Sequence, residues 1–291
     1  MKKLRHLVEY AAVRTFLMLV DALSLRAAEL LASGIADIWF SAASRRRGIT
    51  CDNVRRSGIA TDEMKVRRIA KASFRHFACL IIDSLKSDRY LTPETWQEHI
   101  SLDVPPETLA LLKQPDQGLI LISGHLGNWE IAAQALSFIK PVVGITRDMN
   151  NPYTNALMKK RKPRNAFTLT PKHSANMGRL LKTLRSGNIL ALLTDQHAQH
   201  GMMVDFFGIS ASTHTSHAML HLITKTPMCF GYCVKTGPMQ FMLKASLPIT
   251  VPRTGKRDED VRGILEQLSR ELETAIRAYP EQYLWAHRRW R

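Results

Sequence analysis

The segment "SGHLGNWE" (residues 123–130) follows the apolar run "GLILI" and contains a histidine and a carboxylate, His125 and Glu130. In a regular helix, residues five positions apart differ by about 140° in azimuth, so these two side chains would face apart. Gly127, however, permits a turn, and Asn128 is suited to cap a helix that begins one residue later. Glu130 then falls in the first helical turn, near the histidine of the preceding loop. A carboxylate beside an imidazole fixes its tautomer and raises its basicity, which predicts a general base.

The reaction class follows from this base and from the motifs that are missing. The amide groups of the glycine turn are suited to stabilise an oxyanion, although a histidine in such a place can also simply hydrogen bond to its loop. The chain has no Gly-x-Ser-x-Gly, Gly-x-x-x-x-Gly-Lys-Ser/Thr, Gly-x-Gly-x-x-Gly or His-Glu-x-x-His motif, which disfavours serine hydrolysis, nucleotide binding and the common zinc protease design. Without a protein nucleophile, the simplest reaction is attack on an activated acyl carbon by a substrate hydroxyl that His125 deprotonates.

A cluster of histidines supports a different function. Five of them lie within 25 residues, and the last three share one face of a predicted helix: His197, His200, His214, His217 and His221. Together with Asp195 they are a candidate ligand set for a metal-dependent hydrolase, the alternative function. We favour the interpretation that they flank a lipid or phosphate pocket or lie exposed on the helix, and we predict no metal.

The elements that position these residues form an alternating pattern. Apolar runs at residues 118–123, 141–146, 166–170 and 188–194 are separated by helical segments. This pattern predicts an α/β fold with a mainly parallel central sheet and helices on both faces. Further strands are predicted in "PMCFGYCV" and "QFMLKASL", after a helix that begins near Thr215, and a last helix is predicted at about residues 259–279.

Three polar side chains directly follow predicted strands: His125, Arg147 and Asp195. In open sheets of this class, ligands bind outside the carboxyl ends of the strands. An arginine or aspartate at a strand end is often only a turn or salt-bridge residue. If the strands are neighbours, however, a base, a cation and a carboxylate gather at one edge of the sheet.

The N-terminal region is predicted to be helical over about residues 4–42, with charges that interrupt every apolar run. No stretch reaches the roughly 18 uncharged apolar residues that a membrane-spanning helix needs. We interpret residues 1–42 as an amphipathic helix that either packs on the domain or associates with a membrane surface, and residues 43–291 as one domain. A second helix is predicted at about residues 62–87, with Thr61 as its cap.

The charge of the chain indicates an anionic partner. The 41 Lys and Arg residues against 25 Asp and Glu residues give a formal charge of +16, with clusters at residues 44–47, 54–58 and 159–164. Anionic lipids, an acidic carrier protein and nucleic acid all fit this charge. These three clusters contain no interleaved aromatic residues and the chain has no recognition motif, so we do not expect nucleic-acid binding. The four cysteines form no disulfide framework, which favours a reducing compartment.

Several motifs, in order, resemble those of the lipid A biosynthesis (late) acyltransferases, the bacterial lauroyl and myristoyl transferase family. They are "SGHLGNWE", "TRDMNNPY", "TDQH", "VDFFGISAST" and "PEQYLWAHRRWR", and "RRIAKASFRHFACLIIDSL" resembles the N-terminal helical region of that family. The resemblance implies a glycerol-phosphate-acyltransferase-like fold. It also implies acyl transfer from an acyl carrier protein or CoA thioester, without a further cofactor, to a hydroxyl of a lipid A precursor or related glycolipid. The enzyme would lie at the cytoplasmic face of the inner membrane, peripherally or through an N-terminal anchor.

The resemblance also implies roles for individual residues. His125 would be the general base and Glu130 its partner. Acceptor-binding or catalytic positions would be Asn128, Arg147, Asp195 and Gln196. The chain departs from the usual family pattern at His197, Asp205, His214 and His217. These departures leave the chemistry intact and point to variation in the acceptor, such as another glycolipid or an aminolipid.

Overall fold

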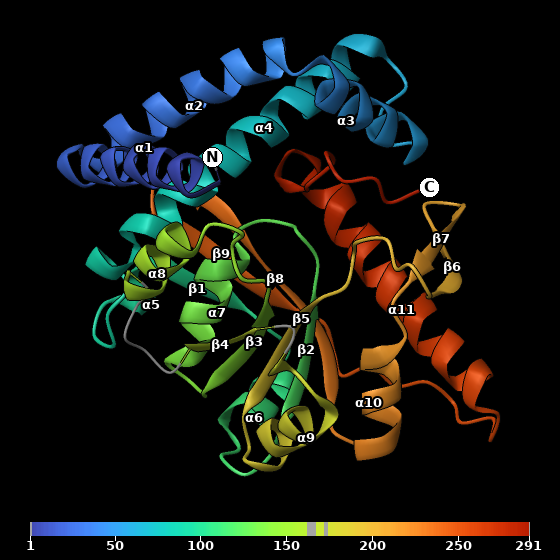
Figure 1. The fold of residues 1–291 in the computed structure, drawn as a ribbon. Coiled ribbons are helices and arrows are strands. Elements are labelled where there is room, and N and C mark those ends of the chain that lie inside the picture. Colours follow the sequence, from blue (N-terminus) through green and yellow to red (C-terminus); the bar gives the residue numbers. More distant parts are fainter. Residues whose placement is uncertain (1, 162–166, 172–173, 291) are drawn as a thin grey trace.

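The computed structural model describes residues 2–161, 167–171 and 174–290, and its centre is a mainly parallel sheet, as predicted (Figure 1). The strand order is β1-β9-β8-β2-β5-β3-β4. In chain order these strands are β1 (Ile100–Asp103), β2 (Leu119–Ser123), β3 (Val142–Thr146), β4 (Phe167–Pro171), β5 (Ile189–Leu193), β8 (Met228–Gly237) and β9 (Gln240–Ala245). Strands β8, β2, β5, β3 and β4 are mutually parallel, β9 runs antiparallel to β8, and β1 runs parallel to β9.

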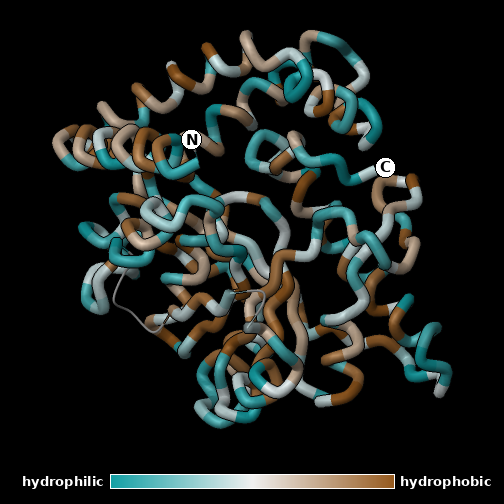
Figure 2. Tube along the Cα trace, viewed as in Figure 1, coloured by the Kyte–Doolittle hydropathy of each residue, from teal (hydrophilic) through white to brown (hydrophobic). Residues whose placement is uncertain are grey.

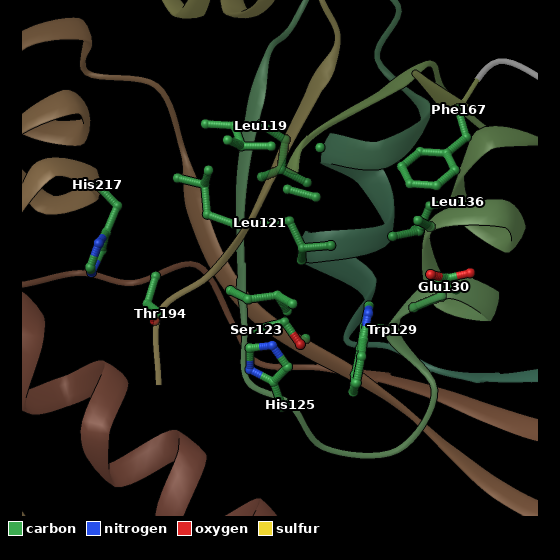
Figure 3. A pocket seen from close by; sticks show the side chains of 18 of the residues that line it. Leu119, Leu121, Ser123, His125, Trp129, Glu130, Leu136, Phe167, Thr194 and His217 are labelled. Atoms are coloured by element: carbon green, nitrogen blue, oxygen red, sulfur yellow. The ribbon is translucent and has the colours of Figure 1, made fainter. Parts of the chain in front are cut away.

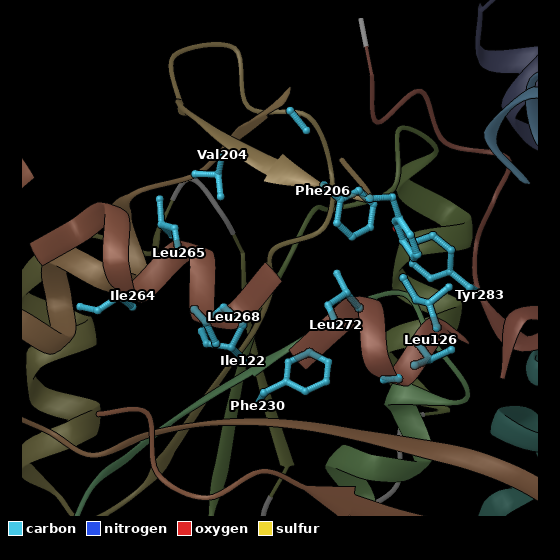
Figure 4. Packing of buried hydrophobic residues seen from close by; sticks show 14 of the residues in the cluster. Ile122, Leu126, Val204, Phe206, Phe230, Ile264, Leu265, Leu268, Leu272 and Tyr283 are labelled. Carbon is cyan, nitrogen blue, oxygen red and sulfur yellow. The ribbon is translucent and has the colours of Figure 1, made fainter. Parts of the chain in front are cut away.

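Helices cover both faces of the sheet, because alternate residues of the central strands point to opposite sides. On β2, Leu119 and Leu121 pack with α6 (Pro106–Lys113) and α7 (Trp129–Ser137). The intervening Ile120 and Ile122 pack in the larger core on the other face, part of which Figure 4 shows. The helices of that face are α9 (Met177–Arg185), α10 (Ser216–Thr224) and α11 (Arg257–Ala278).

The N-terminal helices form a further layer against the sheet domain (Figure 1). They are α1 (Lys2–Ala22), α2 (Leu25–Ala42), α3 (Ser44–Arg56) and α4 (Glu63–Lys86). The prediction of one helix over residues 4–42 was wrong, because Ser24 caps a new helix by accepting a hydrogen bond from the Ala27 amide at 3.2 Å. The cap of α4 is Asp62 rather than Thr61. Helix α2 packs along α4, so residues 25–42 contact the rest of the protein through one face.

The opposite faces of α1 and α2 expose large apolar side chains. On α2 the buried residues are Ala28, Ala32, Ala36 and Phe40, whereas Leu30, Ile35, Ile38 and Trp39 are each at least half exposed. On α1, Leu4, Val8 and Met18 are exposed in the same way, and Figure 2 shows hydrophobic residues recurring along both helices. None of the helices in the described part of the chain combines the length and the apolar character that crossing a membrane requires.

Several elements were not predicted from the sequence. The hairpin β6 (Met202–Phe206) and β7 (Ile209–Thr213) turns at Phe207 and Gly208, which both have positive φ. The other elements that were not predicted are α3, β1, α5 (Trp96–His99), α6 and the short 3-10 helices η1 (Ser87–Arg89) and η3 (Pro280–Gln282). Helix α8 (Pro152–Lys160), by contrast, coincides with one of the predicted helical segments. The basic cluster predicted at residues 159–164 lies partly outside the described residues.

Candidate active site

The strand order brings the predicted polar residues together. Strand β5 lies between β2 and β3, so the loops that follow these three strands meet at one edge of the sheet. His125 follows β2, Asp195 and Gln196 follow β5, and Arg147 follows β3. The expected meeting of a base, a carboxylate and a cation at the carboxyl ends of neighbouring strands is therefore confirmed.

His125 and Asp195 are joined by two hydrogen bonds. The imidazole Nδ1 lies 2.7 Å from Asp195 Oδ1, and the His125 backbone amide donates to Asp195 Oδ2 at 2.8 Å. The Asp195 side chain is only 3 % exposed, and the buried Tyr283 side chain lies close enough to interact with it electrostatically. The other ring nitrogen of His125, Nε2, lies 3.4 Å from Nε2 of Gln196. The carboxylate thus orients the imidazole, and Nε2 is the ring nitrogen that Asp195 does not hold.

The carboxylate partner of His125 is therefore Asp195, whereas the sequence led us to expect Glu130. Helix α7 begins at Trp129, and the Trp129 ring packs edge-on against the imidazole with 4.8 Å between the ring centroids. Glu130, one residue further along the helix, is directed elsewhere, because successive helical residues differ by about 100°. Figure 3 shows its carboxylate beyond Trp129, away from His125. Glu130 is exposed and lines the same cavity.

The glycine turn has the predicted form. Gly127 has φ +62°, and a Cβ atom at this position would lie 2.0 Å from the carbonyl oxygen of Cys233. Asn128 caps α7 by accepting a hydrogen bond from the Ile131 amide at 3.1 Å. Asn128 is fully buried and does not line the cavity, so its position is that of a helix cap, and substrate binding by Asn128 stays a prediction. His76 of α4 holds the turn from outside, with its Nε2 atom 3.1 Å from the Gly127 carbonyl oxygen.

The expectation that the amides of this turn stabilise an oxyanion was wrong for three of them, because each already donates to a protein acceptor. The His125 amide donates to Asp195, the Gly127 amide to the carbonyl of Gln282 at 2.9 Å, and the Asn128 amide to the carbonyl of Cys233 at 2.7 Å. These bonds make the turn rigid. Donors to a developing negative charge must come from other groups, and the side chains of Gln196 and Arg147 line the cavity.

The electrostatics of the pair favour a basic imidazole. Burial lowers the pKa of His125, but the charge and the hydrogen bond of Asp195 outweigh burial and raise this pKa above its usual value near 6.5. For Asp195, burial raises the pKa, and the neighbouring His125 outweighs it so that the pKa is lowered. Asp195 is therefore held in its ionised form, and the imidazole of His125 is more basic than that of an unpaired histidine.

A cavity of about 820 Å³ opens beside His125. Its deeper part lies between the α7 face of the sheet and the helices, where it is lined by apolar side chains that include Leu112, Leu119, Leu121 and Leu136 (Figure 3). We call this part the apolar arm. A second part, which we call the polar arm, is lined by residues of α9 and α10 and of the strand end after β5: Leu180, Leu192, Thr194, His214, Ser216 and His217. Cavities of this volume are typical of small-molecule sites.

Two residues of the closing segment support the site, and sequence reasoning assigned them no role. Tyr283 is bridged to Leu126 and interacts electrostatically with Asp195, and the Leu284 amide donates to the His125 carbonyl at 3.0 Å. The buried guanidinium of Arg289 donates to the Ser212 carbonyl at 2.5 Å and to Gln196, and so fixes the loop after β5. The motif "PEQYLWAHRRWR" contains both residues, but their places on the loops of β2 and β5 depend on how the chain folds back.

The histidines that follow β5 are not gathered into a set of metal ligands in the described part of the chain. Within residues 2–161, 167–171 and 174–290, no three His, Cys, Asp or Glu side chains are placed to share a metal ion. Asp195 is engaged by His125, and His221 Nδ1 lies 2.7 Å from the carbonyl oxygen of Thr226 at the end of α10. The alternative function, a metal-dependent hydrolase, depended on these residues as a ligand set and is therefore not supported.

The comparisons with known proteins agree with this geometry. No curated protein sequence is significantly similar to the chain. The family model described as bacterial lipid A biosynthesis acyltransferase, however, matches residues 1–291. The chain therefore belongs to the bacterial lipid A biosynthesis acyltransferase family.

Proposed function

We propose that this enzyme transfers a fatty acyl chain from an acyl carrier protein or CoA thioester to a hydroxyl group of a lipid A precursor or related glycolipid, with His125 as general base. Membership of an acyltransferase family supports the reaction class. The observation that carries the proposal is the His125–Asp195 pair at the mouth of an apolar cavity. No prosthetic group is needed, because the thioester itself activates the acyl carbon.

The reaction proceeds in two proton transfers. Nε2 of His125 accepts the proton of the acceptor hydroxyl while the hydroxyl oxygen attacks the thioester carbonyl carbon. When the carbon–sulfur bond breaks, the imidazolium returns this proton to the departing thiolate. Asp195 keeps Nδ1 protonated and stabilises the imidazolium, as the carboxylate does in a catalytic triad. The side-chain amide of Gln196, 3.4 Å from Nε2, is placed near the charge that develops on the carbonyl oxygen.

The apolar arm is suited to hold the acyl chain. From Ser123 to Leu119 it follows four residues of β2, or about 13 Å at about 3.3 Å per residue. Each carbon–carbon bond advances an extended chain by about 1.25 Å, since bonds of about 1.5 Å meet at about 111°. A saturated chain of roughly ten carbons would therefore reach Leu119, and the cavity lining continues to Leu112 and Thr108 of α6.

The exposed faces of α1 and α2 support docking to an anionic membrane surface, so that residues 1–42 act as an amphipathic, peripheral anchor on its cytoplasmic side. Large exposed apolar patches on soluble proteins mark interaction sites, and nearby basic residues attract anionic lipids. The mouth of the cavity adjoins this layer. Arg147 precedes α8, whose cap Asn151 donates to the His6 carbonyl of α1 at 2.7 Å. A membrane lipid could thus reach His125 past Arg147.

The overall formal charge of +16 fits both an anionic membrane and an acidic carrier protein.

The order of helices and strands supports a glycerol-phosphate-acyltransferase-like fold, with residues 43–291 as the acyltransferase domain. Arg147, which lines the cavity at its exposed edge, is our candidate for binding the anionic part of the acceptor.

The decisive experiment measures acyl transfer by mass spectrometry. Purified protein is incubated with dodecanoyl acyl carrier protein or dodecanoyl-CoA and a lipid A precursor that still has free hydroxyl groups. We expect an acceptor product heavier by one acyl chain, and we expect His125→Ala to abolish it while the protein remains folded. Absence of product with every acceptor and donor, or full activity of the variant, would refute the proposal.

A further inference from the structure

The mechanism makes no use of a second histidine in the cavity. His217, in the first turn of α10, lines the polar arm and is 2 % exposed. Figure 3 shows its ring near Thr194, across the cavity from Leu136 and Glu130. His217 and His125 therefore lie on different walls of one cavity, and a bound substrate would contact both.

Although His217 is only 2 % exposed, its ring makes no hydrogen bond to another described residue, and its nitrogens are not sealed off from the cavity that it lines. Its neighbour on the same helix, His221, shows how a structural histidine is normally accommodated, because its Nδ1 atom pairs with the Thr226 carbonyl. Buried polar groups almost always have a partner, and exceptions call for an explanation. The first turn of α10 also has no side-chain cap, since Thr215 makes no capping hydrogen bond. Both observations point to a ligand group that occupies the polar arm.

The surroundings decide the chemistry of that group. The polar arm is lined by hydroxyl, imidazole and apolar side chains, whereas the charged residues of the lining, Glu130, Arg147 and Lys244, come from α7, the end of β3 and β9. Burial, with a smaller contribution from His214, lowers the pKa of His217 to about 3, so its ring is neutral at physiological pH. A neutral imidazole offers one hydrogen-bond donor and one acceptor.

We propose that His217 is a specificity-determining residue whose imidazole hydrogen bonds to an uncharged hydroxyl or amide group of a substrate bound in the polar arm. The inference rests on the proposed acyl transfer. Two substrates carry such groups: the acceptor has sugar or acyl hydroxyls, and the donor has the amides of its pantetheine arm. In both cases the group is uncharged and can donate and accept hydrogen bonds. A carboxylate or an ammonium group in place of the imidazole would be unsuited to bind it.

The test compares three variants of His217 in the full chain. His217→Leu keeps the approximate volume and removes the hydrogen bonds, whereas His217→Asn and His217→Gln place an amide near the positions of Nδ1 and Nε2. Steady-state rates are measured with dodecanoyl acyl carrier protein and a lipid A precursor, each varied while the other is saturating. We expect His217→Leu to raise KM for one substrate about 10- to 100-fold with little change in kcat, and one of the amide variants to restore it.

A second measurement separates the two sources of the group. Hydrolysis of the dodecanoyl thioester without acceptor reports on the donor alone. If His217 binds the acceptor, His217→Leu leaves this hydrolysis unchanged, and if it binds the pantetheine arm, KM for hydrolysis rises. His221→Leu is the matched control, because this residue lies one turn further on the same helix and outside the cavity lining. It should leave both KM values unchanged.

The outcomes distinguish this inference from the proposed function. If wild-type protein transfers no acyl chain, the proposed function fails, and so does the inference. If wild type is active and His217→Leu leaves both KM values unchanged, or if it lowers kcat alone and neither amide variant restores it, His217 has only a packing role and the inference is wrong.

Discussion

Asp195 holds His125 at two atoms, the imidazole Nδ1 and the backbone amide, at 2.7 and 2.8 Å. One buried carboxylate thus sets both the position of the loop after β2 and the orientation of the ring. Replacing this carboxylate should impair catalysis more than replacing any other acid of the cavity.

Asp195→Asn should lower kcat by about 10²- to 10⁴-fold, because an amide no longer fixes the tautomer or stabilises the imidazolium. Glu130→Gln is the matched control, since Glu130 lines the same cavity but the carboxylate that contacts the imidazole is that of Asp195. We expect less than a tenfold effect on kcat for this variant. Steady-state kinetics of both proteins check the assignment, and a larger loss for Glu130→Gln than for Asp195→Asn would reverse it.

The pH dependence of the activity should report the protonation state of His125. The base must be neutral, so activity should fall as pH decreases through its pKa, which Asp195 holds above 6.5 against the effect of burial. In Asp195→Asn, burial acts without the opposing charge, and the midpoint of the acidic limb should move below 6.5. Profiles of kcat/KM between about pH 5 and 9 measure this shift. An unchanged midpoint would mean that another group controls the limb.

Gly127→Ala should disrupt the catalytic turn. The position has positive φ, and the new Cβ atom would lie 2.0 Å from the Cys233 carbonyl oxygen, so the backbone would have to move. Gly208→Ala is the control, because Gly208 also has positive φ but open space around its Cβ direction. We expect about 1 kcal/mol of destabilisation for Gly208→Ala from the left-handed conformation alone, and clearly more for Gly127→Ala, with loss of activity. Equal urea midpoints for the two variants would contradict the predicted clash.

Lys235→Met should destabilise the contact between the N-terminal layer and the sheet. Lys235 of β8 pairs with Asp83 of α4 at 2.8 Å and with Glu29 of α2, and the Asp83 side chain is only 1 % exposed. Removing the cation leaves the buried Asp83 carboxylate and the partly exposed Glu29 carboxylate without this partner, and breaking a buried ion pair typically costs about 3–5 kcal/mol. Denaturant unfolding checks this value.

The exposed pair of Lys256 and Glu259 provides the comparison for Lys235→Met. Lys256→Met should change stability by less than about 0.5 kcal/mol, as surface pairs do. The double variant Asp83→Leu with Lys235→Met should recover part of the loss, since it removes a buried charge together with its partner. A loss for Lys235→Met no larger than that for Lys256→Met would show that the buried pair is not needed.

The outer face of α2 should determine binding to vesicles. Replacing Ile35, Ile38 and Trp39 by serine removes exposed apolar side chains without touching the buried face that contacts α4. Cosedimentation with anionic phospholipid vesicles should decrease strongly, whereas the melting temperature should change little. Met64→Ser is the control, because Met64 is 81 % exposed but lies on α4. Undiminished sedimentation of the triple variant would exclude α2 as the docking face.

The parts of the fold that could be predicted are those set by local patterns. Short apolar runs separated by helical segments identified β2, β3 and β5, and the neighbouring order of these strands brought His125, Arg147 and Asp195 together as expected. The turn at Gly127 and the helix cap at Asn128 could also be predicted, because a positive φ and a helix cap each favour particular residue types.

The partner of His125 could not be predicted, because it depends on contacts between distant segments. The spacing within one motif favoured Glu130. Asp195, however, reaches the imidazole from the end of an adjacent strand, and no local sequence rule predicts how β2 and β5 are aligned. The positions of Tyr283 and Arg289 could not be predicted for the same reason, because these residues contact segments that are distant in the sequence. The break between α1 and α2 was missed because Ser24 interrupts an apolar pattern that otherwise continues.

The support that Tyr283 and Arg289 give to the loops of β2 and β5 has a consequence for biosynthesis. A ribosome must extend the polypeptide through these positions before Asp195 has its full set of neighbours. Every shorter nascent chain lacks a finished catalytic centre, even when the strands that bear His125 and Asp195 have already emerged. The site should therefore remain incomplete until residues 283 and 289 have been synthesised and have folded back onto these loops.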